Sequence, residues 1–452
     1  MRRQQTVKHV QNKTLPFSPP QVLALSFFLL VMIGTMVLKL PFATKMPVSW
    51  LDALFTAMSA ATVTGLNVVD TGTTYTYFGQ FVILALIQVG GLGIMSFALL
   101  IFITLGRKIG VKQTIIFREA LNQTSFQTIL PLVKSLFWFS MIVECSVAVV
   151  LLFRFVPDYG WIKGSYYSIF HSISAFNNAG FSPFPTNLVS YVGDPIVMIA
   201  ITTAIILGGL GFPVVMDMLE KRKFRKLMIH SKLMIIGTIF LNLFAMITLF
   251  FLEYTNPQTL QSLHSLSDKL WAAYFQSVTL RTAGFNTIDI QSVTESSAIL
   301  MIALMFIGAG STSTGGGIKL TTFIVILLSV ITFIKGKKEP VIFQRSIKES
   351  VIYRSLAISA VSMMFIFIAQ FILGITEKVS YLRILFEVVS AFGTVGLSMN
   401  VTPELSSIGR IIIIFLMYIG KIGPLTLIYS LTKQDDRNKA NIHYPEGDIF
   451  TG

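Results

Sequence analysis

Eight apolar runs dominate this chain of 452 residues. A helix that crosses a bilayer needs about 20 mostly apolar residues. The runs are centred on residues 22–38, 78–105, 136–153, 195–216, 233–252, 298–334, 357–375 and 408–431. Backbone polar groups find no water in the hydrocarbon core, so such runs must be helical there. The sequence therefore predicts an all-α membrane protein with eight spans, the first of them uncleaved because no signal-peptidase site follows it.

The composition agrees with a chain that is solvated largely by lipid. Hydrophobic residues make up 53% and charged residues only 12%, about half of the roughly 25% found in soluble domains. This charge is too sparse to cover a water-exposed surface, which excludes a soluble enzyme, a disordered chain and a nucleic-acid-binding domain. The single Cys145 excludes an intrachain disulfide and a cysteine-based metal cluster.

Basic residues gather in alternate connections between the runs. Of the 35 Lys and Arg residues, 24 lie in the two tails and in the connections after the second, fourth and sixth runs. Because Lys and Arg are enriched on the cytoplasmic side, both termini are predicted to be cytoplasmic. The basic connections either fix this topology and contact lipid headgroups, which we favour, or dock a cytoplasmic partner.

A glycine-terminated motif recurs in the four remaining connections. Its copies read FTAMSAATVTGL, FHSISAFNNAGF, FQSVTLRTAGF and FEVVSAFGTVGL. Six residues before the shared glycine stand Ser59, Ser174, Val278 and Ser390. A second motif, QVGGLG, ILGGLG, FIGAGS or YIGKIG, follows each copy at nearly constant spacing. Two landmarks with the same period of roughly 110 residues predict four span–loop–span units around a pseudo-fourfold axis.

These landmarks divide the chain into six segments. The N-terminal tail covers residues 1–21, and the first unit covers 22–106. The second unit, with its preceding cytoplasmic loop, covers 107–216, the third covers 217–334 with a broken last span, and the fourth covers 335–431. The C-terminal tail is 432–452.

The polar stretch before each shared glycine is expected to re-enter the membrane. A short inward-pointing helix, such as 50–60 or 268–278, directs its carbonyl end to the centre, and rings of carbonyl oxygens replace the hydration shell of a cation. Glycine permits positive φ and close approach of the backbone. The predicted filter residues are Thr62, Val63, Thr64, Gly65, Asn177, Asn178, Ala179, Gly180, Thr282, Ala283, Gly284, Thr394, Val395 and Gly396.

The predicted filter carries no fixed charge. Neutral carbonyls suit a weakly hydrated monovalent cation, whereas divalent cations usually require carboxylates. Arg281, beside the third stretch, is expected to support its loop from behind. Seven acids near the outer side are interpreted as solvated loop residues, with attraction of cations as the alternative: Asp52, Asp70, Asp158, Asp194, Asp268, Asp289 and Glu387.

The sixth run is interrupted by ten small and polar residues, five of them glycine. Each glycine costs a helix about 1 kcal/mol relative to alanine, so this stretch is not expected to be helical. It is predicted to face the water-filled path below the filter, either as a gate, which we favour, or as a static kink. The gate residues are Gly308, Gly310, Ser311, Thr312, Ser313, Thr314, Gly315, Gly316, Gly317 and Lys319, the last anchoring the segment to carbonyls or a carboxylate.

An ammonium group falls inside the predicted eighth span. Lys421 stands where the other units have Gly91, Gly209 and Ala309. A charge at this depth is costly and is a functional candidate by default. We favour a pore barrier that repels a cation leaving the filter. The alternative is a lysine that snorkels or pairs with an acid on a neighbouring span.

The four filter stretches, the glycine-rich interruption and residues 419–424 (IGKIGP) resemble the Trk/Ktr/HKT superfamily of cation transporters over nearly the whole chain. The likeness is greatest to the membrane subunits of bacterial Ktr potassium-uptake systems. By this resemblance the four shared glycines are selectivity glycines, the interruption is a gating loop, and Gly65 matches the potassium-selective pattern. The family usually has arginine at Lys421, so the charge is kept but the planar fork is lost.

The resemblance also implies the setting of the protein. It implies potassium uptake across a bacterial plasma membrane, with K⁺ at the filter carbonyls and possible stimulation by Na⁺. It further implies a homodimer on a cytoplasmic ring of nucleotide-binding subunits. The chain itself has no G-x-G-x-x-G or P-loop motif, so a second chain must supply any nucleotide site. No organic cofactor and no nucleic-acid partner are expected.

Two other classes of function compete with channel-like conduction. An intramembrane enzyme needs metal ligands or a nucleophile–base pair, but the five histidines are scattered and no H-E-x-x-H motif occurs, so the chain is predicted not to be an enzyme. A Na⁺-selective or proton-coupled cation transporter of the same architecture is the alternative. Glu144 and Lys134 in the third run slightly support a proton-coupled secondary transporter for another solute, whereas a fourfold rather than twofold repeat disfavours it.

Overall fold

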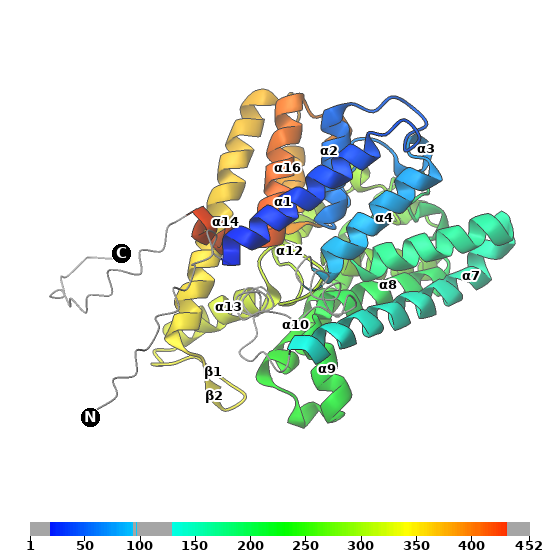
Figure 1. Cartoon of the computed structure of the whole chain (residues 1–452). Helices are drawn as coiled ribbons and strands as arrows, with labels where there is room; N and C mark the ends of the chain where they lie inside the picture. Colours follow the sequence, from blue (N-terminus) through cyan, green and yellow to red (C-terminus); the bar gives the residue numbers. More distant parts are fainter. Residues whose placement is uncertain (1–18, 94–95, 97–128, 432–452) are drawn as a thin grey trace, which may run out of the picture.

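The structure, a computed structural model of the chain, describes residues 19–93, 96 and 129–431 (Figure 1). Most of both predicted tails and most of the basic connection after the second run lie outside these residues. The described chain is almost entirely helical, as predicted. It also contains one antiparallel hairpin, formed by β1 (Val341–Ile342) and β2 (Arg345–Ser346).

Four of the described helices are long and apolar enough to cross a membrane. They contain the predicted first, third, fifth and seventh runs, and they are α1 (Pro19–Leu38), α7 (Ile129–Phe176), α10 (Ile229–Glu253) and α14 (Glu349–Thr376). Helix α7 also includes the short helix that leads into the second filter stretch. Its two parts meet at Gly160, whose φ of 77° and ψ of 169° are not helical.

Shorter helices precede the other three filter stretches, and they are α2 (Trp50–Ala61), α11 (Leu266–Thr279) and α15 (Tyr381–Gly393). The hydroxyl of Ser49 caps α2 by accepting a hydrogen bond from the amide of Asp52, and Ser265 caps α11 in the same way. Such caps satisfy amide groups that the first turn leaves unpaired. The structure confirms that short helices cover 50–60 and 268–278.

In three of the predicted second spans the helix ends at a glycine inside the apolar run, and the remainder of the first of these runs, 97–105, lies outside the described residues. The helices α4 (Tyr77–Leu92), α8 (Pro195–Leu210) and α16 (Ser407–Ile422) each end at a glycine with positive φ. These glycines are Gly93 (84°), Gly211 (91°) and Gly423 (95°). Left-handed backbone cannot continue a helix, so the expectation of unbroken helices over 195–216 and 408–431 was wrong.

The chain continues beyond two of these breaks within the described residues. After Gly211 it bends by 96° into α9 (Phe212–Lys221), and after Gly423 it continues as α17 (Pro424–Leu431). The predicted break in the sixth run is confirmed: α12 (Glu295–Phe306) stops before it and α13 (Leu320–Ile334) follows it. The remaining short helices are α3 (Thr71–Thr74), η1 (Val189–Tyr191), η2 (Phe224–Lys226), η3 (Leu260–Ser262), η4 (Ile290–Ser292) and η5 (Thr402–Glu404).

Helices of successive units contact one another in a cycle. Helix α4 packs against α7, α8 against α11, α12 against α15, and α16 against α2. Figure 1 shows this last contact, where the orange helix near the end of the described chain stands beside a blue one near its beginning. An ion pair joins them, with Arg410 Nη1 2.5 Å from Asp52 Oδ1. The last unit therefore returns to the first.

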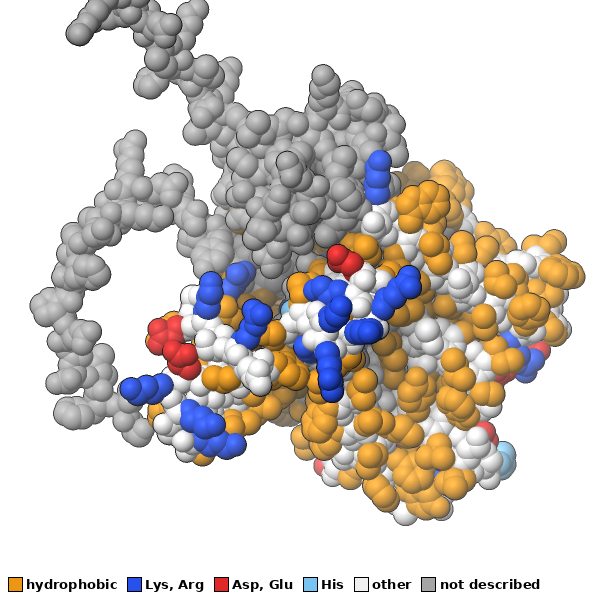
Figure 2. Space-filling view, turned by 90° about the horizontal axis from the view of Figure 1, so that it is seen from below, with side chains coloured by type: hydrophobic (Ala, Val, Ile, Leu, Met, Phe, Trp, Pro, Cys, Tyr) orange, Lys and Arg blue, Asp and Glu red, His pale blue; other side chains and the backbone are white. Residues whose placement is uncertain are grey.

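The outer helices expose large apolar side chains. Phe153 is 75% exposed, Phe251 is 72% exposed and Phe367 is 69% exposed, and hydrophobic side chains cover much of the face in Figure 2. In water such a surface would drive association. On helices long enough to span a bilayer it is the surface that lipid chains cover.

Candidate ion-conducting site

All four predicted filter stretches share one backbone conformation. The residue two places before each glycine has a positive φ: Val63 (52°), Asn178 (56°), Thr282 (68°) and Thr394 (50°). The glycines follow the same rule: Gly65 (92°), Gly180 (68°), Gly284 (75°) and Gly396 (93°). Positive φ is uncommon for residues other than glycine. Its occurrence at four matched positions means that the surrounding protein imposes it.

The four glycines lie in a closed ring. A Cβ atom added to Gly65 would meet the carbonyl oxygen of Ala179 at 2.5 Å, and one added to Gly180 would meet that of Ala283 at 2.8 Å. Continuing around the ring, Gly284 faces the carbonyl of Val395, and Gly396 faces the carbonyl of Thr64. Each glycine thus faces the next unit, and any side chain there would collide with a carbonyl oxygen. The structure therefore brings together the four glycines and the residue that precedes each of them, Thr64, Ala179, Ala283 and Val395.

Hydrogen bonds from the filter amides fix the direction of its carbonyls. In the first unit the amide of Thr64 donates to the carbonyl of Ser59 at 2.8 Å, and the amide of Gly65 donates to the Ser59 hydroxyl at 3.0 Å. In a trans peptide the N–H and the preceding C=O point in opposite directions. The carbonyls of Val63 and Thr64 therefore point away from α2 and toward the ring.

The same support recurs in the other units. In the fourth unit the carbonyl of Ser390 accepts a hydrogen bond from the amide of Val395 at 2.8 Å, and its hydroxyl accepts one from the amide of Gly396 at 3.1 Å. In the second unit the carbonyl of Ser174 accepts a hydrogen bond from the amide of Ala179 at 2.8 Å. In the third unit, where the matching residue is Val278, the carbonyl of Thr279 accepts from Ala283 at 3.0 Å. The recurring serine was visible in the sequence as a landmark, but its role as a filter support was not predicted.

One of the seven outer acids is not a solvated loop residue. Glu387 lies inside α15 and is fully buried. Its carboxylate accepts hydrogen bonds from the hydroxyls of Ser398, at 2.6 Å, and Thr402. Both hydroxyls belong to the segment that follows Gly396. The hydrogen bonds of Glu387 therefore connect this segment to α15, the helix that precedes the filter stretch. The interpretation of Glu387 as solvated was wrong, because a helix periodicity places it on the inner face.

Several of the other acids have structural partners. Asp70 caps α3, Asp289 caps η4, and Asp194 both caps α8 and pairs with Arg154. Asp52 pairs with Arg410, as described above. The side chains of Asp52 and Asp194 are only 15% and 13% exposed, so the interpretation of these two acids as solvated loop residues was also wrong.

The glycine-rich interruption forms a loop that is closed at its neck. Ile307 and Ile318 form a parallel β-bridge, and the amide of Gly308 donates to the carbonyl of Ile318 at 2.8 Å. Between them, the amide of Gly316 donates to the Thr394 hydroxyl at 2.9 Å. A Cβ on Gly315 would collide with the Thr282 hydroxyl. The loop therefore lies directly against two of the four filter stretches.

Three cationic side chains hold this loop through its carbonyl groups. Lys319 donates to Gly315 at 2.7 Å, Lys421 donates to Thr314 at 2.5 Å, and Arg281 donates to Gly308 at 3.0 Å. No carboxylate forms an ion pair with any of the three among the described residues. The expected carbonyl anchor for Lys319 is confirmed. Lys421 has a loop carbonyl as its partner, rather than an acid on a neighbouring span.

The loop also touches the break in the second unit. The amide of Gly310 donates to the carbonyl of Gly209 at 2.8 Å, and the amide of Thr314 lies 3.4 Å from the carbonyl of Gly208. A Cβ on Gly211 would lie 2.5 Å from the carbonyl oxygen of Ser311. The bend between α8 and α9 is thus in direct contact with the predicted gate.

Comparison with known proteins assigns this arrangement to a family. The TrkH family, described as cation transport proteins, matches residues 9–440. The chain belongs to the TrkH family of cation transport proteins. It is 56% identical to the Ktr system potassium uptake protein B of Bacillus subtilis over 97% of this chain and 98% of that protein. It is 38% identical to the potassium/sodium uptake protein NtpJ of Enterococcus hirae, over 96% of this chain and 97% of that protein.

The fold of this TrkH-family chain also matches a solved structure. The crystal structure of the potassium transporter TrkH from Vibrio parahaemolyticus aligns with a TM-score of 0.72 at 19% identity, covering 93% of this chain and 86% of that one. The predicted resemblance to the Trk and Ktr proteins is therefore confirmed. The chain is a multi-pass plasma-membrane transport protein, and the prediction that it is not an enzyme is confirmed by its family.

Proposed function

We propose that this TrkH-family protein takes up potassium by channel-like conduction through the ring of filter carbonyls. The observation that carries the proposal is the closed cycle of four glycines, each facing a carbonyl of the next unit. Carbonyl rings replace the hydration shell of a monovalent cation without adding fixed charge. The membrane potential would drive entry with about 2.3 kcal/mol per charge per 100 mV.

The proposed pore has four span–loop–span units around a pseudo-fourfold axis, eight spans and two cytoplasmic termini. The cyclic packing of successive units supports this arrangement, as does the ion pair between Arg410 and Asp52. The helices that precede the filter turn their carbonyl ends inward, which favours a cation at the centre. The predicted unit boundaries remain part of this proposal.

The loop from Gly308 to Lys319 is the proposed gate. Its hydrogen bonds to Thr394 and Gly209 hold it against the filter. Lys319, Lys421 and Arg281 bind its carbonyls, so opening requires these contacts to break or move together. Lys421 then serves two roles in the proposal: its charge opposes a cation below the filter, and its hydrogen bond keeps the loop closed.

The proposed assembly is a homodimer that works with a cytoplasmic regulatory subunit. The names of two relatives, both Ktr system potassium uptake protein B from Bacillus subtilis and Vibrio alginolyticus, support a multi-component system. A nucleotide-binding ring would act from the side on which the basic connections lie. Nucleotide control requires that second chain.

A role for sodium is the second candidate. NtpJ, a relative at 38% identity, is named a potassium/sodium uptake protein, so Na⁺ is proposed either as a stimulating ion or as a transported one. Proton coupling is the weaker form of this alternative. Glu144, its sequence-based support, lies behind the second filter stretch, where it accepts hydrogen bonds from Gln88 at 3.0 Å and Asn177 at 3.2 Å.

Parallel flux measurements in proteoliposomes test the proposal. The purified protein is reconstituted, and K⁺, Na⁺ and internal pH are followed in the same preparation, with and without a cytoplasmic fraction. Potassium conduction predicts K⁺ entry that follows the imposed potential without a change in pH. Uptake of Na⁺ in preference to K⁺ would instead support a Na⁺-selective transporter. K⁺ uptake that requires an opposing or accompanying proton would support a proton-coupled one.

A further inference from the structure

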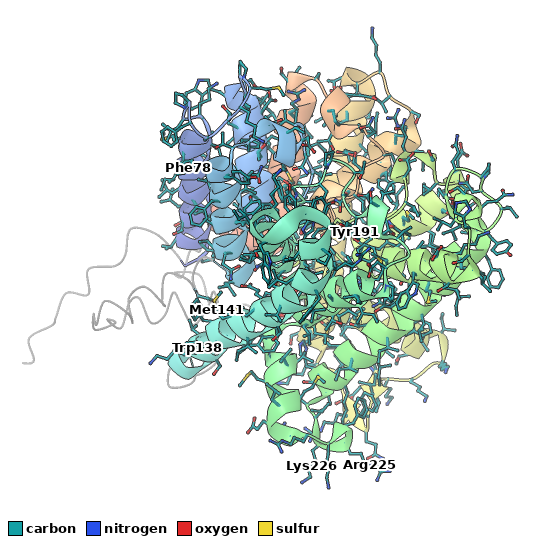
Figure 3. The ribbon with its side chains drawn as sticks, turned by 90° about the vertical axis from the view of Figure 1, so that its right-hand side faces the viewer. Phe78, Trp138, Met141, Tyr191, Arg225 and Lys226 are labelled. Atoms are coloured by element: carbon teal, nitrogen blue, oxygen red, sulfur yellow. The ribbon has the colours of Figure 1, made fainter. Side chains whose placement is uncertain are left out.

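A loop with strong positive charge joins α9 to α10. This basic loop, residues 222–228, contains Arg222, Lys223, Arg225 and Lys226, all exposed. None of the four forms an ion pair among the described residues. Figure 3 shows Arg225 and Lys226 at the outer tip of the loop, and Figure 2 shows Lys and Arg side chains gathered on this lower face.

The nearby acids leave this charge uncompensated. Asp217 is buried, and its carboxylate is occupied by Lys221 at 2.7 Å and by the amide of Met228 at 2.8 Å. Glu220 is exposed beside the loop. Of the two acids on α9, only Glu220 is therefore left to face the four outward cations.

The loop is held in a defined shape. Arg222 has a left-handed backbone, with φ of 52°, and its amide closes α9 by donating to the carbonyl of Met218 at 3.0 Å. Lys232, on α10, donates to the carbonyl of Arg225 at 2.8 Å. Asp217 fixes the other end through Met228, as described above. The four cations are thus presented by an ordered backbone, which lowers the entropy lost when a ligand binds.

Apolar side chains are interleaved with the cations. Leu219 is 59% exposed, Phe224 is 46% exposed and Met228 is 48% exposed. The loop also directly follows the apolar helices α8 and α9 and directly precedes α10. Basic and apolar side chains that alternate at the end of a span are typical of a surface in contact with anionic headgroups and the adjacent acyl chains.

Helix α9 connects the basic loop to the proposed gate. Its first residue follows Gly211, whose backbone packs against Ser311 of the gate loop, and its last residue precedes Arg222. A helix of ten residues transmits a shift at one end to the other as a rigid unit. A ligand that holds the basic loop would therefore bias the position of the bend against the gate.

We propose that the basic loop binds the phosphate headgroup of an anionic phospholipid from the cytoplasmic leaflet, and that this occupancy shifts the gate equilibrium through α9. The inferred binding of a phosphate headgroup depends only on the basic loop. The inferred effect of lipid binding on the gate equilibrium rests on the proposed function of residues 308–319 as a gate. A protein partner is less suited to this loop, because the exposed apolar side chains adjoin the lipid-facing helices rather than standing apart from them.

The test compares two variants that lose equal charge. In one, Arg222, Lys223, Arg225 and Lys226 are all changed to glutamine. In the control, four exposed cations near the hairpin are changed instead: Lys335, Lys337, Lys338 and Arg345. Each protein is placed in phosphatidylcholine nanodiscs and titrated with fluorescent phosphatidylglycerol. K⁺ flux is measured in phosphatidylcholine liposomes with and without phosphatidylglycerol.

The proposal expects the loop variant to bind phosphatidylglycerol more weakly, by roughly fivefold for each charge removed, and to lose the dependence of flux on that lipid. The control should keep both. Phe224→Ser should also weaken binding while keeping every charge, which separates a lipid site from a general surface potential.

Three outcomes would overturn it. If the loop variant and the control bound phosphatidylglycerol equally well, the lipid would be attracted non-specifically and the basic loop would not be a lipid site. If the loop variant no longer bound phosphatidylglycerol but its K⁺ flux still depended on that lipid as in the parent, the basic loop would not be coupled to the gate. A loop variant that responds normally to lipid but loses its response to the cytoplasmic fraction would identify a protein-docking loop instead. Because binding is measured without flux, failure of the proposed potassium conduction would be seen separately.

Discussion

The filter ring and the gate loop lie against each other but are built differently. The ring uses four copies of one backbone conformation, each held by hydrogen bonds to its own preceding helix. The gate loop occurs once, between α12 and α13, and several of the hydrogen bonds that hold it come from other units, such as those to Thr394 and Lys421. Local repeated contacts favour a rigid element. Contacts made across units can break without unfolding any helix.

This difference teaches where selectivity and movement can reside. A ring of carbonyls discriminates ions only if its geometry is maintained, and here each copy carries its own support. A gate must have two arrangements separated by a few kcal/mol, and a loop held by a few hydrogen bonds of about 0.5–3 kcal/mol each meets that condition. Changes in the ring should therefore alter selectivity, and changes in the loop should alter flux.

The largest effect is expected from Gly65→Ser. Left-handed backbone costs a residue with a Cβ about 1–2 kcal/mol, and the added atom would meet the carbonyl of Ala179 at 2.5 Å. We expect K⁺/Na⁺ discrimination to fall by roughly tenfold or more, measured by parallel uptake kinetics. Gly336→Ser is the matched control, since it has φ of 62° but no atom within 4 Å of the added Cβ. Equal discrimination by parent and Gly65→Ser would contradict a filter here.

Removal of the gate tip should change flux rather than selectivity. A deletion of residues 311–314 removes the acceptor of Lys421 and the contact with Gly211. We expect K⁺ flux through a folded protein to rise by roughly tenfold, with the K⁺/Na⁺ ratio kept. A folded deletion variant that conducts less than the parent would mean that the loop supports the pathway instead of closing it.

Lys421→Met sharpens the same comparison with one side chain. It removes a charge-assisted hydrogen bond worth about 1.5–3 kcal/mol and the charge below the filter. We expect several-fold higher flux, measured under a fixed potential, and Lys421→Arg should restore much of the closure because it keeps both charge and donors. Flux that is unchanged in Lys421→Met would remove both of its proposed roles.

Glu387→Ala tests the outer support of the ring. It would leave the buried hydroxyl of Thr402 and the half-buried hydroxyl of Ser398 without their acceptor, at about 1–3 kcal/mol. We expect lower thermal stability and more Na⁺ uptake, with Glu387→Gln affected less because it keeps an acceptor. Glu349→Ala, at an exposed site, serves as control. If only stability changed, Glu387 would be a general packing residue and not a filter support.

The smallest effect is expected from Thr394→Val. This change removes the hydroxyl that accepts from the Gly316 amide at 2.9 Å and keeps the side-chain shape. A neutral hydrogen bond contributes about 1 kcal/mol, so flux should rise about fivefold or less while selectivity stays near that of the parent. A loss of selectivity without a gain in flux would assign this hydroxyl to the ring and not to the gate.

The sequence predicted some elements because their signals are local. The helix at 50–60 lies in an apolar stretch that ends before a polar one, and the break after Phe306 follows from five glycines close together. The breaks at Gly93, Gly211 and Gly423 had a signal as well, since each closes a recurring glycine motif. They were missed because a single glycine within an apolar run does not by itself reveal whether its φ is positive.

What the sequence alone determined is the helical membrane class, the fourfold recurrence of the glycine motif and the site of the glycine-rich interruption. These follow from hydropathy and backbone preference, which act over a few residues. Only the tertiary structure decided that Glu387 is buried, that Thr394 accepts a hydrogen bond from the loop, and that Gly211 packs against Ser311. The last two contacts join residues about 80 to 100 positions apart, and their existence depends on how the helices pack rather than on any local pattern.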